Sequence, residues 1–117
     1  MKTRMKKFMA LYMAPVAEME KMMANSTPED TEASMGQWMK WMEAHKKELV
    51  DMGAPLGKTK RVTANGISDT KNDIGGYSIV QAESAAAAAK LFEDSPHFVG
   101  MPGSWIEVIE CMPMPST

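Results

Sequence analysis

The stretch Gly75-Gly76-Tyr77-Ser78-Ile79-Val80-Gln81-Ala82-Glu83-Ser84 predicts the centre of the fold. The double glycine leads into β-favouring residues, so we expect a buried strand over 77–82. Ser84 is a preferred helix N-cap residue, and Ala85–Lys90 has the highest helix propensity available. The second half of the chain is therefore built around a strand followed at once by a short helix.

Apolar segments on either side of this unit predict two more strands. Trp105–Met112 is expected to be the last strand, after a loop, Ser95-Pro96-His97-Phe98, that carries a histidine. Lys7–Met13 is a nearly continuous apolar run that ends at Ala14-Pro15, which favours a central strand. The segment Val16–Ala24 fits either a short helix or a packed loop.

A long helix is predicted from Thr27-Pro28-Glu29-Asp30, which combines a cap residue, a proline at the first helical position and two acids. Gly53 with Pro55 would end it after Met52. His45 falls inside its apolar stripe, where a charged or polar ring is unusual. The stripe is expected to face a sheet and comprises Met35, Trp38, Met39, Trp41, Met42, Leu49 and Met52.

The region between the two helices predicts an edge strand over 55–63, a turn at Asn65-Gly66 and a polar loop over 67–74. The order strand, helix, strand, strand, helix, strand is that of an α+β, ferredoxin-like βαββαβ fold with an antiparallel sheet. Both helices would cover one sheet face and leave the other apolar. Two such sheets packed face to face would give a dimeric α+β barrel, so we expect a homodimer.

Composition indicates one domain over residues 1–117, with flexible ends at 1–5 and 113–117. The 13 basic and 15 acidic residues give a net charge of −2, which argues against a dedicated nucleic-acid binder. Cys111 is the only cysteine, so an internal disulfide or a cysteine-based metal cluster is excluded. We expect a cytoplasmic protein without metal or cofactor. Fourteen methionines suggest an adaptable core or dimer seam.

The N-terminus has the basic and then apolar character of a signal peptide, over Met1–Lys7 and Phe8–Ala14. Pro15 and Glu18, however, stand where a small-residue cleavage site is expected. A buried first strand accounts for the same residues and is the interpretation we favour. The sequence has no apolar stretch of about 18 residues that would span a membrane, so we expect no membrane partner.

The sequence around the double glycine resembles the YCII-related family, including its DGPF-type branch. Asp69-Thr70-Lys71 is similar to the family's acid-Thr-Lys, and Ser95-Pro96-His97 to its His-Pro-His turn. The opening strand, Lys7–Tyr12, and the final strand, Ile106–Val108, also fit. The resemblance spans nearly the whole chain and implies a homodimeric α+β barrel with a pocket between helices and sheet. It implies no particular reaction.

Two departures from the family pattern bear on function. The branch's Asp-Gly-Pro-Phe is replaced here by Asn65-Gly66-Ile67-Ser68. Ser95 stands where the family's His-Pro-His turn has its first histidine. In other YCII-type proteins a His–Asp pair is suspected of catalysis, and here the resemblance would place it near the first helix.

Chemistry based on histidine must use His45, His97 or both, because the chain has no other. His97 is the candidate general base, since it lies in a loop, and an acid must orient it. Asp69, Asp73 and Glu110 are acids that the predicted sheet would bring close, and the two aspartates are preferred. The residues expected to bind a ligand are Trp38, Trp41, His45 and Tyr77.

Three functions follow from these residues. The first is acid–base catalysis of a lyase or isomerase type on a small organic molecule, by His97 and an aspartate. The second is a non-catalytic ligand-binding or regulatory homodimer with an apolar pocket lined by methionine and tryptophan. The third is a structural interaction module without a pocket.

Overall fold

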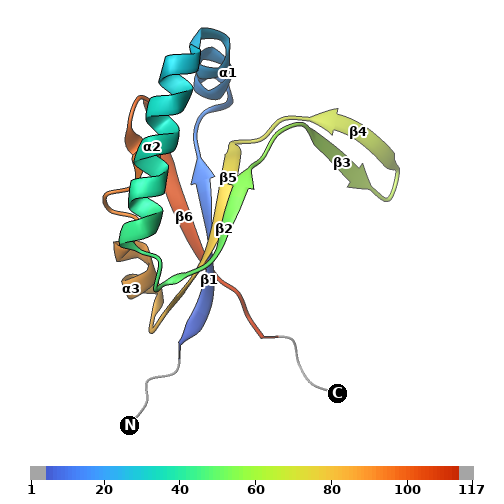
Figure 1. Ribbon diagram of the computed structural model, residues 1–117. Helices are drawn as coiled ribbons and strands as arrows, with labels where there is room; N and C mark the ends of the chain where they lie inside the picture. The colour runs from blue at the N-terminus through green and yellow to red at the C-terminus, as the bar shows by residue number, and fades with distance from the viewer. Residues whose placement is uncertain (1–4, 114–117) are drawn as a thin grey trace.

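The computed structural model describes residues 5–113, so the predicted flexible ends at 1–5 and 113–117 lie outside this range except for residues 5 and 113. The chain forms an α+β fold (Figure 1). In chain order the elements are β1 (Lys6–Met13), α1 (Val16–Asn25), α2 (Pro28–Ala44), β2 (Leu49–Pro55), β3 (Thr59–Thr63), β4 (Gly66–Thr70), β5 (Ile74–Ala82), α3 (Ala85–Lys90), the 3-10 helix η1 (Pro96–Phe98) and β6 (Trp105–Glu110).

The main sheet has the strand order β2-β5-β1-β6 and is antiparallel throughout. This order is compatible with the predicted ferredoxin-like fold. The predicted first strand, the strand before Ser84 and the final strand are confirmed. Ser84 caps α3 through a bond from the Ala87 amide to its hydroxyl, and Val16–Asn25, left open above, is a helix.

Strand alternation places the core on the sheet face that α2 and α3 cover. Phe8 and Val80 stand opposite each other on β1 and β5 and are fully buried there. Trp41 from α2 and Phe92, just after α3, complete the contact between helices and sheet. The core is thus a single layer of side chains between one sheet face and two helices.

A chain of two hydrogen bonds fixes three strands beneath α2. The Ser78 hydroxyl donates to the Met52 carbonyl oxygen at 2.8 Å, so its oxygen accepts from the Tyr12 hydroxyl, also at 2.8 Å. β2, β5 and β1 are joined in this way inside the core. Burial raises the pKa of the Tyr12 hydroxyl above its usual 10.0, although the bond to Ser78 acts in the opposite direction.

The long helix begins as predicted but ends earlier. Thr27 and Asp30 form a capping box, each side chain accepting from the other's backbone amide at 3.1 Å. The helix was expected to reach Met52 but ends at Ala44, and Leu49–Pro55 instead form β2 beside β5. This expectation was wrong because Leu49 continues the helical spacing while also alternating as a strand residue.

Gly53 does not end a helix but forms an irregularity within β2. Its φ is +77°, and an added Cβ would lie 1.6 Å from the Tyr77 carbonyl oxygen. Only glycine fits so close to the neighbouring strand. The stripe on α2 is also narrower than predicted, because Met35 and Met39 are 59% and 62% exposed and Trp41 is the buried residue.

The region 55–70 departs most from the prediction. The strand expected over 55–63 is confirmed in part, as β3 over Thr59–Thr63. The loop expected over 67–74 was wrong in its first half, because Gly66–Thr70 form β4 and pair with β3 in a separate two-stranded sheet. The turn at Asn65-Gly66 is confirmed, and Gly66 has a φ of +141°. We name residues 59–70 the arm, because this ribbon projects from the main sheet on the side away from the helices (Figure 1).

The sheet face opposite the helices carries no covering element in residues 5–113 (Figure 1). Its centre is apolar, since Met9 pairs with Ile79 on one side and Ile109 on the other. Leu11 and Tyr77 form the adjoining pair. We call these five residues the open face. In this part of the chain, none of the helices combines the length and apolar character needed to cross a membrane.

The buried Tyr12 hydroxyl should make stability fall with rising pH. Above about pH 10 the unfolded chain loses the tyrosine proton while the folded chain keeps it, so unfolding becomes more favourable. Tyr12→Phe should flatten this alkaline decline and cost about 0.5–1.5 kcal/mol at neutral pH. Chemical denaturation at several pH values measures both. Tyr77→Phe is the matched control, and an alkaline decline equal in both variants would contradict the assignment.

Candidate functional site

His97 lies inside the protein and not in an open loop. It belongs to η1, where the Ser95 hydroxyl accepts from its backbone amide at 3.2 Å. Its ring is buried beside Tyr12, with 5.4 Å between the ring centroids. Nε2 lies 2.7 Å from the Met13 carbonyl oxygen. Because a carbonyl only accepts, Nε2 carries the proton. His97 therefore fastens η1 to the end of β1.

The aspartates predicted to serve His97 do not pair with it. Asp69 lies on the arm and forms an ion pair with Lys60. Asp73 contributes its backbone carbonyl, which accepts from the Ala14 amide at 2.9 Å. Between residues 5 and 113, His97 has no carboxylate oxygen within 4.0 Å of its ring nitrogens. The three predicted catalytic residues are thus not brought together in this structure.

A different histidine and a different aspartate meet instead. His45 Nε2 lies 3.6 Å from Asp94 Oδ1, and the same oxygen accepts a hydrogen bond from Trp41 Nε1 at 3.3 Å. The His45 and Trp41 rings are 4.7 Å apart. At 3.6 Å the His45–Asp94 contact is longer than a hydrogen bond, and His45 Nε2 is buried with no hydrogen-bond partner among the described residues.

Helix geometry explains why Trp41 and His45 meet the same acid. They are four residues apart on α2, so both side chains lie on one face. His45 is the helix C-cap, and its amide donates to the Trp41 carbonyl at 3.1 Å. Trp41 is held in turn by stacking on Phe92, at 5.2 Å between centroids, and by a second bond from Nε1 to the Leu91 carbonyl at 3.2 Å.

Asp94 is positioned by the turns that continue from α3. The amides of Leu91, Phe92, Glu93 and Ser95 each donate to the third preceding carbonyl. Phe92 enters the core, and Asp94, two residues later, is 74% exposed at the surface. A buried anchor therefore places an accessible carboxylate beside Trp41 and His45.

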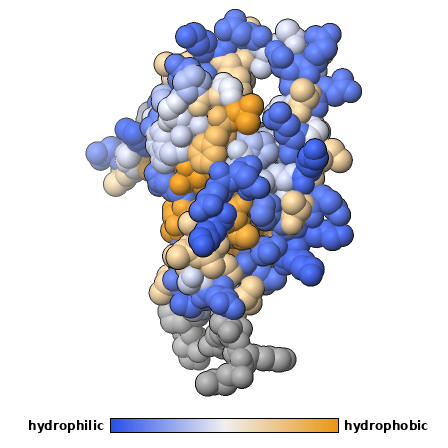
Figure 2. Space-filling view, turned by 90° about the vertical axis from the view of Figure 1, so that its left-hand side faces the viewer, coloured by the Kyte–Doolittle hydropathy of each residue, from blue (hydrophilic) through white to orange (hydrophobic). Residues whose placement is uncertain are grey.

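Asp94 and Trp41 line an open groove of about 290 Å³ between α2 and the segment after α3. The remaining lining residues are Gln37, Lys40, Ala44, Pro96 and Val99. The groove is mainly apolar, with an amide, an ammonium and a carboxylate at its border. Figure 2 views the helix-covered side and shows apolar surface near its middle, bordered by polar side chains.

The predicted ligand-binding residues fall on two sides of the sheet. Trp41 borders the groove, His45 stands next to it, and Trp38 packs edge-on against Tyr12 at 4.9 Å between ring centroids. Tyr77 pairs with Leu11 on the open face, away from the other three. A second open groove, of about 390 Å³, is lined by Met39, Met42, Glu43, Lys46, Leu49 and Met52.

Asp94 was not predicted as a site residue, because the acids expected in the site, Asp69, Asp73 and Glu110, were all candidate partners of His97. The available signal was the spacing of Trp41 and His45, which allows one acid from another segment to meet both. Within the described range, no three His, Cys, Asp or Glu side chains gather in a way that would hold a metal ion.

The two histidines should differ in their contribution to stability. His97→Leu leaves the Met13 carbonyl without its partner and should cost about 1–3 kcal/mol. His45→Leu removes a buried nitrogen that has no partner in the structure and should cost little or even stabilise. Denaturant unfolding of both variants measures the difference. Equal losses would show that the His97–Met13 contact is not a stabilising bond.

Comparison with known proteins agrees with these observations. The model of the YCII-related domain matches residues 9–112, from β1 past the end of β6. No curated protein matches the chain. Because the match covers nearly the whole sequence and the fold is α+β, the chain belongs to the YCII-related family.

Proposed function

We propose that this protein binds a small organic molecule in the groove beside Asp94, and that Asp94 exchanges a proton with that molecule. The observation that carries this proposal is the environment of one exposed carboxylate, which two side chains at the end of α2 approach. Asp94 is exposed on the groove wall, Trp41 donates to its Oδ1, and His45 stands 3.6 Å from the same oxygen. Oδ2 makes no hydrogen bond with the described residues and is free for a ligand.

The groove suits a ligand with an apolar or aromatic body and one acidic or hydroxyl group. Trp41, Ala44 and Val99 offer apolar contacts. The ammonium of Lys40 and the amide of Gln37 can bind a carboxylate or phenolate. A volume near 290 Å³ is at the small end for ligand sites. Small carboxylic acids and phenols meet these requirements.

Asp94 can act as an acid–base group because His45 stands next to its oxygen. A C–H beside a carbonyl of the ligand would pass its proton to Asp94 Oδ2, and the electron pair of that bond would form an enolate. Return of the proton to a different atom of the enolate is the step of an isomerase. In a lyase the enolate would instead expel a leaving group from the β-carbon, and that group would take the proton from Asp94. Catalytic contacts commonly shorten when a ligand binds, which would bring His45 into hydrogen-bond range of Oδ1.

A role for His97 as the general base would need a rearrangement. Its Nε2 donates to the Met13 carbonyl, so the ring would have to leave this bond or use Nδ1. Asp69 would also have to leave Lys60. The pair of His45 and Asp94 needs no such change, and the acid–base proposal therefore rests on it.

Non-catalytic binding is the second candidate, and the methionine-rich groove favours it. Met39, Met42 and Met52 with Leu49 form a flexible apolar surface. An ion pair between Lys46 and Glu43, at 3.2 Å, stands at its border. This groove would bind an apolar ligand without proton transfer.

We also propose a homodimer in which two open faces pack together as a dimeric α+β barrel. The rows of Met9, Ile79 and Ile109 and of Leu11 and Tyr77 form an apolar surface that no helix of the described chain covers. Soluble proteins seldom leave such surfaces in water. A second copy would supply the missing layer.

Ligand binding should depend on Asp94. We expect a panel of small carboxylic acids and phenols to include compounds that raise the melting temperature of the wild type. Asp94→Asn keeps the shape and should weaken their binding at least roughly tenfold, since one charged hydrogen bond is lost. Thermal shift and titration calorimetry measure this effect.

Glu93→Gln is the matched control, because it removes an adjacent exposed carboxylate and should leave binding unchanged. Deuterium uptake into the bound compound from heavy water separates proton transfer from binding alone. The proposal would be overturned in favour of the methionine-rich groove if Asp94→Asn kept its affinity for these compounds and Met42→Glu lost it.

Dimerisation should depend on the open face. Ile79→Lys places a charge at the centre of that face and should give a monomer, because burying an unpaired ammonium is costly. Sedimentation velocity measures the change in mass. Met35→Lys, on the exposed side of α2, is the control and should remain dimeric. A dimer in both variants would place the interface elsewhere.

A further inference from the structure

The arm is the part of the described chain with the least support from its own domain. Every residue from Lys60 to Asp69 is exposed, and β3 and β4 pair only with each other. Two contacts tie its base: Lys71 bonds Glu20 of α1 at 2.9 Å, and Asn72 bonds Thr59 at 3.5 Å. An isolated two-stranded ribbon is marginally stable in water at best. The arm therefore needs a partner surface.

The two faces of the arm differ. Val62 stands directly opposite Ile67, so their side chains lie on the same face, with the Lys60–Asp69 ion pair beside them. Val62 and Ile67 are 73% and 72% exposed. The other face carries only polar groups and the turn glycine, from Thr59, Arg61, Thr63, Gly66, Ser68 and Thr70. An exposed apolar pair of this kind, on one face of the ribbon only, would gain from lying on another surface.

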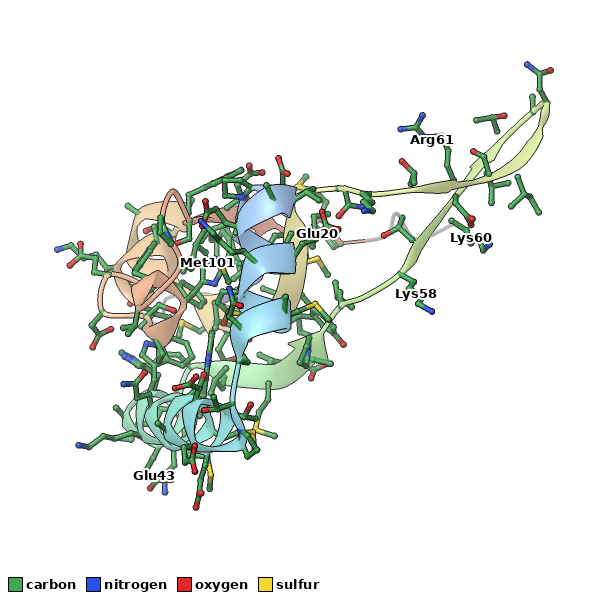
Figure 3. The ribbon with its side chains drawn as sticks, turned by 90° about the horizontal axis from the view of Figure 1, so that it is seen from above. Glu20, Glu43, Lys58, Lys60, Arg61 and Met101 are labelled. Atoms are coloured by element: carbon green, nitrogen blue, oxygen red, sulfur yellow. The ribbon has the colours of Figure 1, made fainter. Side chains whose placement is uncertain are left out.

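The direction of the arm indicates where that surface is. In Figures 1 and 3 the arm runs away from the helices and out on the side of the open face. The molecule measures 51 × 43 × 20 Å and has a radius of gyration of 16.2 Å. A compact chain of this length would have about 13 Å. Any molecule seated on the open face would lie next to the arm.

Charge favours a second copy of this chain as the partner. The arm with its two flanking lysines, Lys58 and Lys71, contains four basic residues and one acidic residue, a net charge of +3. Two of these lysines, Lys60 and Lys71, form ion pairs within the chain. Since the whole chain carries −2, the remainder carries −5. Figure 3 shows Lys58 at the base of the arm and Lys60 and Arg61 on it, away from the helices. We call the rest of the chain, outside residues 58–71, the acidic body. Glu107 pairs with Leu11 of the open face and places a carboxylate on β6, an edge strand of this body.

We propose that the arm of each copy lies against the acidic body of its partner, with Val62 and Ile67 facing inward. Both copies carry an arm and an open face, so each copy would place its arm on the other in the same way. The inference rests on the proposed homodimer and adds to it a second, peripheral contact. The arm then gains the support that its own domain does not provide.

The test replaces the apolar pair while keeping its preference for β structure. Val62→Thr with Ile67→Thr retains branching at Cβ and removes apolar surface. We expect the dimer dissociation constant, from sedimentation over a dilution series, to rise roughly ten- to a hundredfold. Thr59→Ser with Thr70→Ser, on the opposite face of the arm, is the matched control and should leave it unchanged. Isotope-filtered NMR of mixed labelled and unlabelled chains should show contacts from the Val62 and Ile67 methyl groups to the other copy.

Each outcome decides a separate claim. A weaker dimer in the apolar-pair variant alone, with the intermolecular NMR contacts, supports the inference. If the wild type forms a dimer and neither variant changes its dissociation constant, the arm has no role in the contact. The proposed dimer through the open face would then be unaffected. A wild type that stays monomeric at high concentration overturns both. Binding of nucleic acid by the basic arm, with an unchanged dimer, would also overturn the inference.

Discussion

The buried hydroxyl of Tyr12 is the contact on which the rest of this structure depends. It donates to Ser78, which donates to the Met52 carbonyl, and so links the three strands β1, β5 and β2. The Tyr12 ring meanwhile lies against Trp38 and His97, from two segments that are far apart in sequence. A single side chain thus satisfies its own polar group and sets the distance from the sheet to the elements above it.

The groove follows from this arrangement. With α2 held over Tyr12, Trp41 can stack on Phe92 and reach across to the chain after α3. The Trp41 indole N–H then donates to two acceptors, the Leu91 backbone carbonyl and the Asp94 side-chain carboxylate. A buried ring with a polar end explains how a surface carboxylate is held in one place. His45, one turn further along, has a buried nitrogen next to that carboxylate without a hydrogen-bond partner among the described residues.

Local signals in the sequence predicted the elements whose ends are set by local chemistry. The capping box at Thr27, the cap at Ser84 and the turn at Asn65-Gly66 all act within four residues, and all are confirmed. The end of α2 was missed because Leu49 satisfies both the helical and the strand pattern, and pairing with β5 decides between them. The family was recognised from the order of short motifs, and the domain match confirms it. The meeting of His45 with Asp94 joins residues 49 positions apart, which no spacing within one element reveals.

The candidate site and the proposed assembly use opposite sides of one sheet. The groove is made from α2 and the segment after α3, all within one chain, whereas the open face and the arm lie on the far side. Adjacent residues of β1 serve both sides, because Tyr12 points into the core while Leu11 belongs to the open face. Packing a second copy against Leu11 and Tyr77 would therefore stiffen the same strands that carry Tyr12 and Ser78. The proposed dimer would thus support the candidate groove without contributing a residue to it.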